Sequence, residues 1–303
     1  MAAAIGGFDF CNNLVYHRGK RRGYMNKFCD LHTHSVFSDG TCTPSQLIEE
    51  AAALGLSAIA LTDHNTVDGL WDFLAAAEGT DVLAVPGVEF SVDYGDTELH
   101  LLGLFIDPVH FPTVQAVANE YLRQKAQSNL DLIAALEQAG YVVDFEKIQA
   151  MSPNGNINRA HIAAALTEKG YTASITEAIL TLLAKDGPYY RQPARPTVWE
   201  MLDLLNTIGA VPVLAHPFLN LNEDQLRVFL PAAKERGLRG MEAAYSTYDE
   251  ATTACAERLA REFGLLPSGG SDYHGANKVG IYMGTGRGNL KVPAEWVDKL
   301  KKI

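Results

Sequence analysis

Two histidines spaced two residues apart, His32 and His34, could bind one metal ion. They follow a short apolar stretch that is typical of a β-strand, and side chains two apart on a strand point the same way. Asp39 adds a carboxylate from the turn that follows. Imidazole nitrogen with carboxylate oxygen suits zinc, manganese or iron better than magnesium or calcium. Paired histidines are also common on ordinary strand surfaces, so further ligands are needed to support a site.

Most of the other candidate ligands lie at, or just past, a strand-like apolar run. They are His64, Glu89, His100, His216, Asp272 and His274. In a parallel α/β barrel the C-terminal ends of the strands meet on one face, so residues far apart in sequence come together there. Chance would not place so many of the nine histidines at this kind of position. The sequence therefore predicts a multinuclear metal site.

Each residue also has an ordinary structural explanation when it is considered alone. His64 could be a hydrogen-bonded residue at a helix start, and His100 could be a satisfied core histidine. His161 opens a predicted helix, where an exposed position is the usual case. Glu89 differs, because an unpaired carboxylate on an apolar strand is costly to bury and favours a cation nearby. The metal hypothesis therefore depends on the whole set.

Alternating strands and helices are expected to position these residues. A helix from 44 to 54 is favoured by Thr43 as N-cap, Pro44 at its first position and Gly55 after its end. The first four predicted strands span 28–33, 58–61, 82–90 and 98–106. A second helix is predicted at 67–77. This alternation is typical of βα units and predicts an α/β fold with a parallel sheet or barrel.

Residues 112–187 interrupt that alternation and predict an all-helical insert that caps the active site. Their helical spacing covers 113–139, 158–169 and 175–184, with no strand of comparable strength between them. The α/β pattern then returns with strands at 211–215, 239–243 and 265–268 and helices at 198–208, 223–235 and 249–263. We therefore expect one barrel domain formed by residues 27–111 and 188–303.

Bulk properties limit the classes of protein that the chain could be. With 303 residues and 47% hydrophobic residues it can form one large barrel, and no apolar run approaches the roughly 20 residues of a membrane span. The net charge of −11 argues against a large nonspecific nucleic-acid surface, but it does not exclude a small anionic substrate. The cysteines have no CxxC or disulfide spacing, which predicts free thiols and a cytoplasmic location: Cys11, Cys29, Cys42 and Cys255.

Residues 1–26 differ in composition from the rest of the chain. Small residues precede a basic cluster at 17–22, which is the wrong order for a secretory signal. We expect a disordered leader, and a short nucleic-acid-binding arm is the alternative.

As an ordered set, these motifs resemble those of the polymerase-and-histidinol-phosphatase (PHP) superfamily. They are His32-Thr33-His34, Asp39-Gly40, Thr62-Asp63-His64, Gly87-Val88-Glu89, His100, Arg159-Ala160-His161, Ala215-His216-Pro217 and Gly270-Ser271-Asp272-Tyr273-His274. The resemblance covers about residues 27–285 and implies a distorted (β/α)7 TIM-like barrel with a trinuclear metal centre at the strand ends. The chain is most similar to a subgroup with a helical insert. That subgroup includes 3′,5′-nucleotide bisphosphate phosphatases and enzymes that remove nucleotides from the 5′ end of short RNAs.

The resemblance also implies which residues hold each divalent ion, with manganese, iron and zinc all acceptable. The first set is His32, His34, Glu89 and Asp272. The second set is Asp39, His64 and His274, and in the third Glu89 bridges to an ion held by His100 and His161. One departure is Ala160, where the subgroup often carries Pro, and its effect on the ligand is expected to be small.

The expected reaction is hydrolysis of a phosphomonoester on a small metabolite, with a nucleotide such as a 3′,5′-bisphosphate as the favoured substrate. A hydroxide bridging the metal ions would be the nucleophile. Arg159 is the candidate phosphate clamp, because a guanidinium fork matches phosphate geometry. His216 could protonate the leaving oxygen, bind phosphate, or be a histidine that supports the ligands by hydrogen bonds. Arg191 and Arg195 could contact a second phosphate.

Three alternatives remain open from the sequence. The motifs do not separate a phosphatase from a 5′→3′ exoribonuclease acting on short RNA. A histidinol-phosphate phosphatase is less favoured because of the insert. A noncatalytic, metal-stabilised binding module would be expected only if ligands had been lost. The expected partner is a small phosphorylated substrate, with no membrane and no stable nucleic-acid complex, and the oligomeric state stays undetermined.

Overall fold

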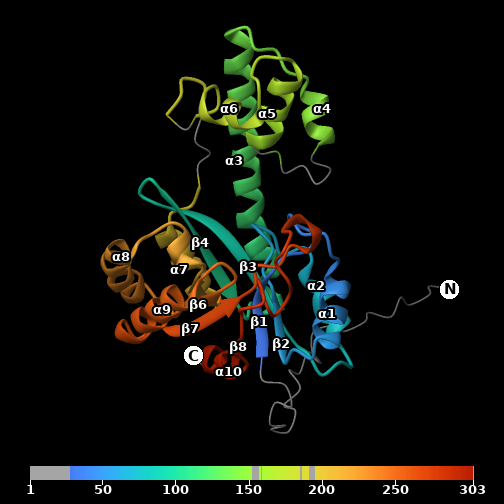
Figure 1. Ribbon diagram of the computed structural model, residues 1–303. Coiled ribbons are helices and arrows are strands. Elements are labelled where there is room, and N and C mark those ends of the chain that lie inside the picture. The colour runs from blue at the N-terminus through green and yellow to red at the C-terminus, as the bar shows by residue number, and fades with distance from the viewer. Residues whose placement is uncertain (1–27, 152–156, 158, 185, 191–194, 303) are drawn as a thin grey trace, which may run out of the picture.

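An eight-stranded curled sheet forms the centre of the molecule, with helices around it and a helical lobe standing off on one long helix (Figure 1). The computed structural model describes residues 28–151, 157, 159–184, 186–190 and 195–302. The predicted leader at residues 1–26 and Arg191 lie outside the described residues. The order of strands across the sheet is β7-β6-β5-β4-β3-β2-β1-β8.

The first three strands are parallel and are joined by two helices. They are β1 (Phe28–Thr33), α1 (Pro44–Ala53), β2 (Ala58–Leu61), α2 (Leu70–Ala77) and β3 (Leu83–Tyr94). Thr43 caps α1 in a reciprocal capping box with Gln46, as the N-cap prediction requires. The strands are mostly buried because helices cover one side and the curled sheet encloses the other.

The next strand, β4 (Thr97–Leu104), runs antiparallel to both β3 and β5. A two-residue turn makes this reversal, because Tyr94 pairs with Thr97 and Gly95 between them has a positive φ of 58°. The start of β4 therefore lies at the same rim as the C-terminal ends of the parallel strands. This reversal places His100 near that rim, although it lies early in its strand.

The second half of the sheet returns to parallel βα units. Its elements are α7 (Val198–Thr207), β5 (Val211–Leu214), α8 (Glu223–Glu235), β6 (Gly240–Tyr245), α9 (Glu250–Glu262), β7 (Leu266–Gly270), β8 (Val292–Pro293) and α10 (Glu295–Lys301). The sequence analysis did not identify β8 and α10. β8 is only two residues long and pairs antiparallel with β1, so it carries no periodicity of its own.

The curl brings the segment after β7 against β1. The Asp272 N–H donates to the His32 carbonyl at 2.8 Å, and the His34 N–H donates to the Tyr273 carbonyl at 2.9 Å. Gly270 permits this approach, because any Cβ at its position would collide with His32. The predicted α/β class is confirmed, with a parallel-rich sheet curled into a half-barrel. A complete (β/α)7 barrel stays a prediction.

In the part of the chain that the structure describes, the helical lobe between β4 and α7 has four α-helices. They are α3 (Phe111–Gln138), α4 (Phe145–Ala150), α5 (Arg159–Glu168) and α6 (Ile175–Leu180). The first turns of α3 belong to the main hydrophobic core, whereas its last turns form a separate core with the other three helices. The sequence analysis missed α4, which has only six residues and depends on Asp144 as N-cap.

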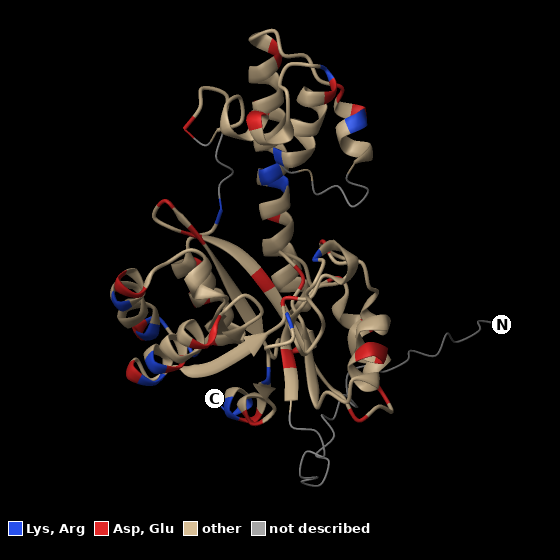
Figure 2. Cartoon of the chain, in the orientation of Figure 1, with Lys and Arg blue, Asp and Glu red and all other residues tan. Residues whose placement is uncertain are grey.

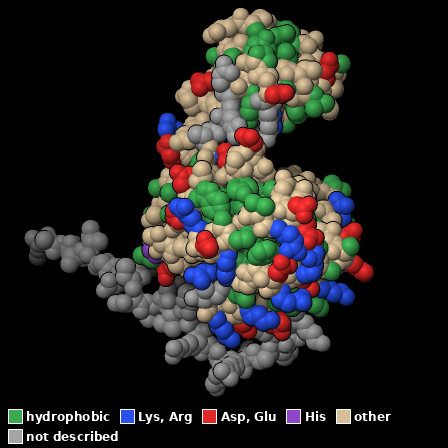
Figure 3. All heavy atoms as spheres, turned by 90° about the vertical axis from the view of Figure 1, so that its left-hand side faces the viewer, with side chains coloured by type: hydrophobic (Ala, Val, Ile, Leu, Met, Phe, Trp, Pro, Cys, Tyr) green, Lys and Arg blue, Asp and Glu red, His purple; other side chains and the backbone are tan. Residues whose placement is uncertain are grey.

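The outer helices carry interspersed acidic and basic side chains (Figure 2), and the face drawn in Figure 3 mixes both signs with apolar patches. Many of these charges are paired, for example Arg227 with Glu262 and Arg236 with Asp203, each at 2.6 Å. Within the described residues, no helix is both long enough and apolar enough to cross a membrane.

Candidate metal centre

One rim of the sheet gathers histidine and carboxylate side chains from six strands or the loops that follow them. Their nitrogen and oxygen atoms fall into four overlapping groups, within each of which the ligand atoms lie no more than 4.8 Å apart. The residues are His32 and His34 at β1, Asp39 in the next loop, His64 after β2, Glu89 in β3, His100 in β4, His216 after β5, and Asp272 and His274 after β7. The structure thus brings together eight of the nine predicted ligands with His216.

The first group is centred on His32, His34 and Asp272. Glu89 Oε2 lies 3.3 Å from the Nε2 atoms of both His32 and His34. Asp272 Oδ1 lies 3.1 Å from His34 Nε2 and 3.6 Å from His32 Nε2. These are the four residues that the resemblance assigned to one ion, and their donor atoms face one another.

The second group combines Asp39, His64 and His274 with His34. Asp39 Oδ1 lies 3.1 Å from His274 Nε2 and 3.9 Å from His34 Nδ1, and its Oδ2 lies 3.9 Å from His64 Nε2. The Asp39 side chain is 53% exposed, whereas that of His34 is fully buried. This group therefore forms the solvent-facing side of the centre.

Glu89 is the common member of the remaining groups. Its Oε1 lies 2.8 Å from His100 Nδ1 and 3.1 Å from His216 Nε2, and its Oε2 lies 2.9 Å from His64 Nδ1. Among the described residues, none of these groups includes His161, which lies on α5 in the helical lobe. A glutamate that contacts histidines with both oxygens is placed to bridge neighbouring cations.

Several buried atoms of the cluster make no hydrogen bond of suitable geometry within the described structure, despite the short distances between some of them. They are His32 Nε2, both ring nitrogens of His34, His64 Nδ1, Glu89 Oε2 and His216 Nδ1. Orphaned buried polar atoms are costly unless something else satisfies them. Imidazole nitrogens and carboxylate oxygens facing one another are a suitable donor set for divalent ions such as manganese, iron or zinc. The residues present therefore fit a metal centre.

The electrostatics of the site keep the His34 imidazole neutral and the Glu89 carboxylate charged, which are the protonation states of metal ligands. Burial, with neighbouring His64 and His274, lowers the pKa of His34 to about 3, so its imidazole is neutral. Burial alone would raise the pKa of Glu89, but the surrounding histidines outweigh it and hold that pKa well below its usual value. Burial would likewise lower the pKa of His100, but Glu89 raises it to about 10, so a cation bound there would displace a proton.

Glu242 in β6 is a supporting residue that the sequence analysis missed. Its Oε1 lies 3.1 Å from His32 Nδ1, and its Oε2 accepts the backbone N–H of His216 at 2.7 Å. A carboxylate on the far nitrogen of a ligating histidine fixes the orientation and tautomer of the ring. The signal was present in the sequence, because Glu242 lies on an apolar strand just as Glu89 does.

Two further buried carboxylates hold the loops that carry ligands. Asp63 accepts hydrogen bonds from the Ser35 backbone and hydroxyl at 2.7 and 2.6 Å, which stabilises the loop leading to Asp39. Asp30 accepts the N–H groups of Ser271 and Gly284 at 2.8 and 2.7 Å, which stabilises the segment next to Asp272. The ligands are therefore positioned by fixed backbone.

The backbone itself is unusual at two cluster positions. His216 has a φ of 26° and Asp272 a φ of 55°. Such values are uncommon for residues with a side chain and persist only where the surrounding structure imposes them. This strain is consistent with a functional site at the rim.

The predicted substrate residues are not gathered in the same way. In the lobe, Arg159 donates to the Leu183 carbonyl at 3.2 Å, and its guanidinium carbon lies 5.1 Å from the centre of the Tyr190 ring. Arg195 pairs with Asp93 at 3.0 Å and with Glu98 at 2.9 Å. Glu98 in turn lies 3.8 Å from His100 Nε2, so Arg195 reaches the edge of the metal centre through one shared carboxylate.

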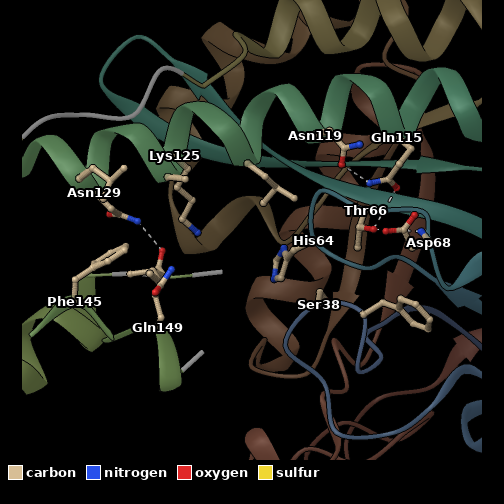
Figure 4. Close-up of a pocket in the computed structure, with 15 residues that line it drawn as sticks. Ser38, His64, Thr66, Asp68, Gln115, Asn119, Lys125, Asn129, Phe145 and Gln149 are labelled. Atoms are coloured by element: carbon tan, nitrogen blue, oxygen red, sulfur yellow. Dashed lines mark hydrogen bonds between the residues drawn. The ribbon is translucent and has the colours of Figure 1, made fainter. Parts of the chain in front are cut away.

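A pocket of about 530 Å³ opens beside the cluster, between the sheet rim and the lobe (Figure 4). His64 lies on its wall, and one face of α3 runs along it. The other lining residues are Phe37, Ser38, Thr66, Asp68, Gln115, Asn119, Leu122, Lys125, Ala126, Asn129, Leu130, Phe145, Gln149 and Ile157. This mixture of aromatic, amide and charged groups suits a polar organic substrate larger than phosphate.

Comparison with known proteins agrees with this geometry. A family described as the PHP domain matches residues 30–203, more than half of the chain. The 5′-3′ exoribonuclease Rnm of Escherichia coli is 29% identical over 81% of this chain and 84% of its own length. A phosphoribosyl 1,2-cyclic phosphate 1,2-diphosphodiesterase of Eggerthella lenta is 32% identical over 81% of this chain and 94% of its own length.

A 3′,5′-nucleoside bisphosphate phosphatase of Chromobacterium violaceum is 28% identical over 84% of this chain and 90% of its own length. Among solved structures, a candidate metal-dependent phosphoesterase from Bifidobacterium adolescentis superposes with a TM-score of 0.70 at 26% identity. That superposition covers 90% of this chain and 94% of the other. The likeness therefore extends over nearly the whole length of both chains.

Proposed function

The chain belongs to the PHP-domain family of metal-dependent phosphoesterases, and on this premise we propose that it hydrolyses phosphate esters of nucleotides. The preferred substrate is a nucleoside 3′,5′-bisphosphate, from which one phosphomonoester is released as inorganic phosphate. The observation that supports this proposal most is the set of orphaned ligand atoms next to a pocket large enough for a nucleotide, with one of their residues, His64, in the pocket wall. A relative with a matching name supports the choice of substrate.

We assign three divalent ions to the cluster, as manganese, iron or zinc. His32, His34, Glu89 and Asp272 would hold the first, Asp39, His64 and His274 the second, and Glu89, His100 and His161 the third. When bound, such ions polarise phosphoryl oxygens and lower the pKa of a coordinated water. Glu242 keeps the Nε2 of His32 directed into the cluster, because it occupies the Nδ1 side of the same ring.

The lobe would complete the site. His161 and Arg159 lie near the start of α5 and become ligand and phosphate clamp only when α5 lies against the sheet rim. His216 is only 5% exposed and sits against Glu89, so its position favours support of the cluster. Protonation of the leaving oxygen by His216 is the alternative role.

A 5′→3′ exoribonuclease acting on short RNA is the second candidate, and the shape of the pocket favours it. The lining face of α3 extends from Gln115 to Leu130, a rise of about 22 Å at ~1.5 Å per residue. That length exceeds the reach of one nucleotide. Relatives named as 5′-3′ exoribonucleases also support this candidate. One centre could serve both reactions, because both transfer a phosphoryl group to water.

The test is a substrate panel with purified protein loaded in turn with manganese, iron and zinc. The panel contains adenosine 3′,5′-bisphosphate, adenosine 3′-monophosphate, histidinol phosphate, a phosphodiester and a 5′-phosphorylated RNA trimer. We expect phosphate release to be fastest from the bisphosphate. Fast release of 5′-mononucleotides from the trimer with slow bisphosphate turnover would replace the first candidate by the second. Preferred turnover of histidinol phosphate would exclude both.

Elemental analysis of the same preparations tests the number of ions. Three bound ions per chain are expected from the assigned ligand sets. Fewer than two ions per chain, together with no turnover of any ester, would favour a noncatalytic binding module.

A further inference from the structure

We propose that Lys125 of α3 determines substrate specificity by binding a second phosphate group, one nucleoside away from the ester at the metal centre. This inference deepens the proposed function and rests on it. The ligand chemistry is shared by two sources: the other phosphate of a nucleoside 3′,5′-bisphosphate, or the second phosphodiester of a short RNA, one nucleoside beyond the first phosphodiester, which is the bond that the metal centre would cleave.

The position of Lys125 is the first observation. It lines the same pocket as His64, which belongs to the metal cluster. Its side chain extends from α3 into the space between His64 on one side and Asn129 and Gln149 on the other (Figure 4). A substrate that is bound at the cluster and fills this pocket would therefore lie beside the ammonium group of Lys125.

The second observation is that a further basic residue, Arg195 on the segment before α7, lies near enough to act on Lys125. Burial, followed by the positive charge of Arg195, lowers the pKa of Lys125. Glu98 and Asp39 act on Lys125 with the opposite sign, so charges of both signs lie near this lysine. A phosphate bound in the pocket beside Lys125 would be attracted by Lys125 and by the nearby Arg195.

Arg195 is held in a fixed orientation near Lys125 by its pairs with Asp93 and Glu98, at 3.0 and 2.9 Å. Arg195 does not line the pocket, whereas Lys125 does, so we assign the direct phosphate contact to Lys125. A lysine is suited to this task, since its compact ammonium on a flexible stem can follow phosphates in somewhat different positions. Arg195 supplies long-range attraction.

The pocket continues beyond Lys125 with groups that fit a nucleoside. Phe145 offers an aromatic ring on which a base can stack, and the amide of Gln149 can reach base edges. The order along the pocket is then metal centre, Lys125, and aromatic and amide side chains. A nucleotide with two phosphates can contact the metal centre, Lys125 and the aromatic and amide side chains, whereas a simple phosphomonoester can contact only the metal centre.

The test compares Lys125→Ala and Lys125→Arg with the wild type on matched substrates. Removing a hydrogen bond to a charged group costs about 1.5–3 kcal/mol, so we expect kcat/KM for adenosine 3′,5′-bisphosphate to fall roughly 10–100-fold in Lys125→Ala. Adenosine 3′-monophosphate should change by less than about threefold, because it lacks the second phosphate. Lys125→Arg should recover part of the loss. Lys147→Ala, at an exposed lysine of the same lobe paired with Glu168, is the control.

The RNA trimer with a 5′-phosphate separates the two sources of the second phosphate. A larger loss on the bisphosphate than on the trimer in Lys125→Ala assigns the site to a terminal phosphate. A larger loss on the trimer assigns it to the phosphodiester. Equal losses on the monophosphate and on the two larger substrates would overturn the inference, as would no loss on any of them.

A binding measurement separates this inference from the proposed function. Calorimetric titration of chelator-treated protein with adenosine 3′,5′-bisphosphate needs no turnover. We expect the Kd to rise about tenfold in Lys125→Ala and not in Lys147→Ala. Selective weakening without turnover by the metal-loaded wild type would overturn the proposed reaction and keep the subsite. An unchanged Kd would overturn the subsite and leave the reaction standing.

Discussion

The metal centre and the helical lobe lie on opposite sides of one pocket, yet they are positioned in different ways. Ligands of the centre come from six strands of one sheet or the loops beside them, and buried carboxylates fix several of those loops. The lobe is carried by α3, and its far end has a hydrophobic core of its own. The rim therefore has many independent supports, whereas the lobe has few.

This difference explains which candidate residues the structure brings together. Asp30 and Ser271 are 241 positions apart and still form a buried hydrogen bond, because β1 and β7 are neighbours. Arg159 and His161 lie at the start of α5, and their distance from the rim depends on where α3 places the lobe. Residues on a sheet rim are preorganised by the fold, and residues on the lobe are not.

The largest effect is expected from Glu89→Gln, which removes the shared charge of the rim. Glu89 contacts histidines on four strands or strand ends, so loss of its charge should weaken the binding of more than one ion. Metal ions supply several kcal/mol of transition-state stabilisation, so kcat/KM should fall by about 10³-fold or more. Phosphate release and metal content per chain measure this. The exposed Glu235→Gln is the control, and full activity in Glu89→Gln would contradict the centre.

A smaller effect is expected from Glu242→Gln, which leaves every proposed ligand in place. Loss of the carboxylate beside His32 Nδ1 should weaken metal affinity by about 10–100-fold. Competition with a chelator measures that affinity. If Glu242 acted only in packing, the temperature of thermal unfolding of the metal-free variant would be lowered, while its metal affinity would stay at the wild-type value.

His161→Ala tests the lobe side of the comparison. One bound ion should be lost while the other two remain, and kcat/KM should fall by about tenfold, less than for a rim ligand. His110→Ala, at a histidine outside the described clusters, is the matched control. Loss of all three ions in His161→Ala would show that the lobe governs the whole centre.

The smallest effect on activity is expected from Leu166→Ala, in the core of the lobe. The side chain is fully buried, so its loss should cost about 2–5 kcal/mol of local stability. Hydrogen exchange should quicken in α5 and α6 while the two ions assigned to rim residues alone stay bound. Leu102→Ala in β4, equally buried in the main core, should instead lower global stability and metal retention. Equal metal loss in both variants would remove the distinction between the regions.

The sequence predicted much of the site because strand ends carry their own signals. His32 and His34 show the two-residue period of a strand, and Glu89 and His216 each close an apolar run. Short elements were harder to predict. The α4 helix and the β8 strand are too short for a periodic pattern and exist because the rest of the fold holds them.

Lys125 and Glu242 show a different limit of sequence reasoning. Neither residue lies in a motif with other ligands, so spacing could not connect them to the site. Lys125 matters because α3 passes the metal cluster, and Glu242 matters because the curl of the sheet places β6 beside β1 residues. Such proximity is a property of the packed chain and has no local pattern.

The sequence by itself determined the α/β class, and it identified as candidate ligands most of the histidines and carboxylates that the structure gathers at the rim. Residue type and strand period carry this information, since both are local properties. Only the tertiary structure decided how the ligands group, that β4 runs antiparallel, and that α3 lines a pocket beside His64. The reason is physical: these features depend on the curl of the sheet and on the packing of α3, which arise from contacts between residues distant along the chain.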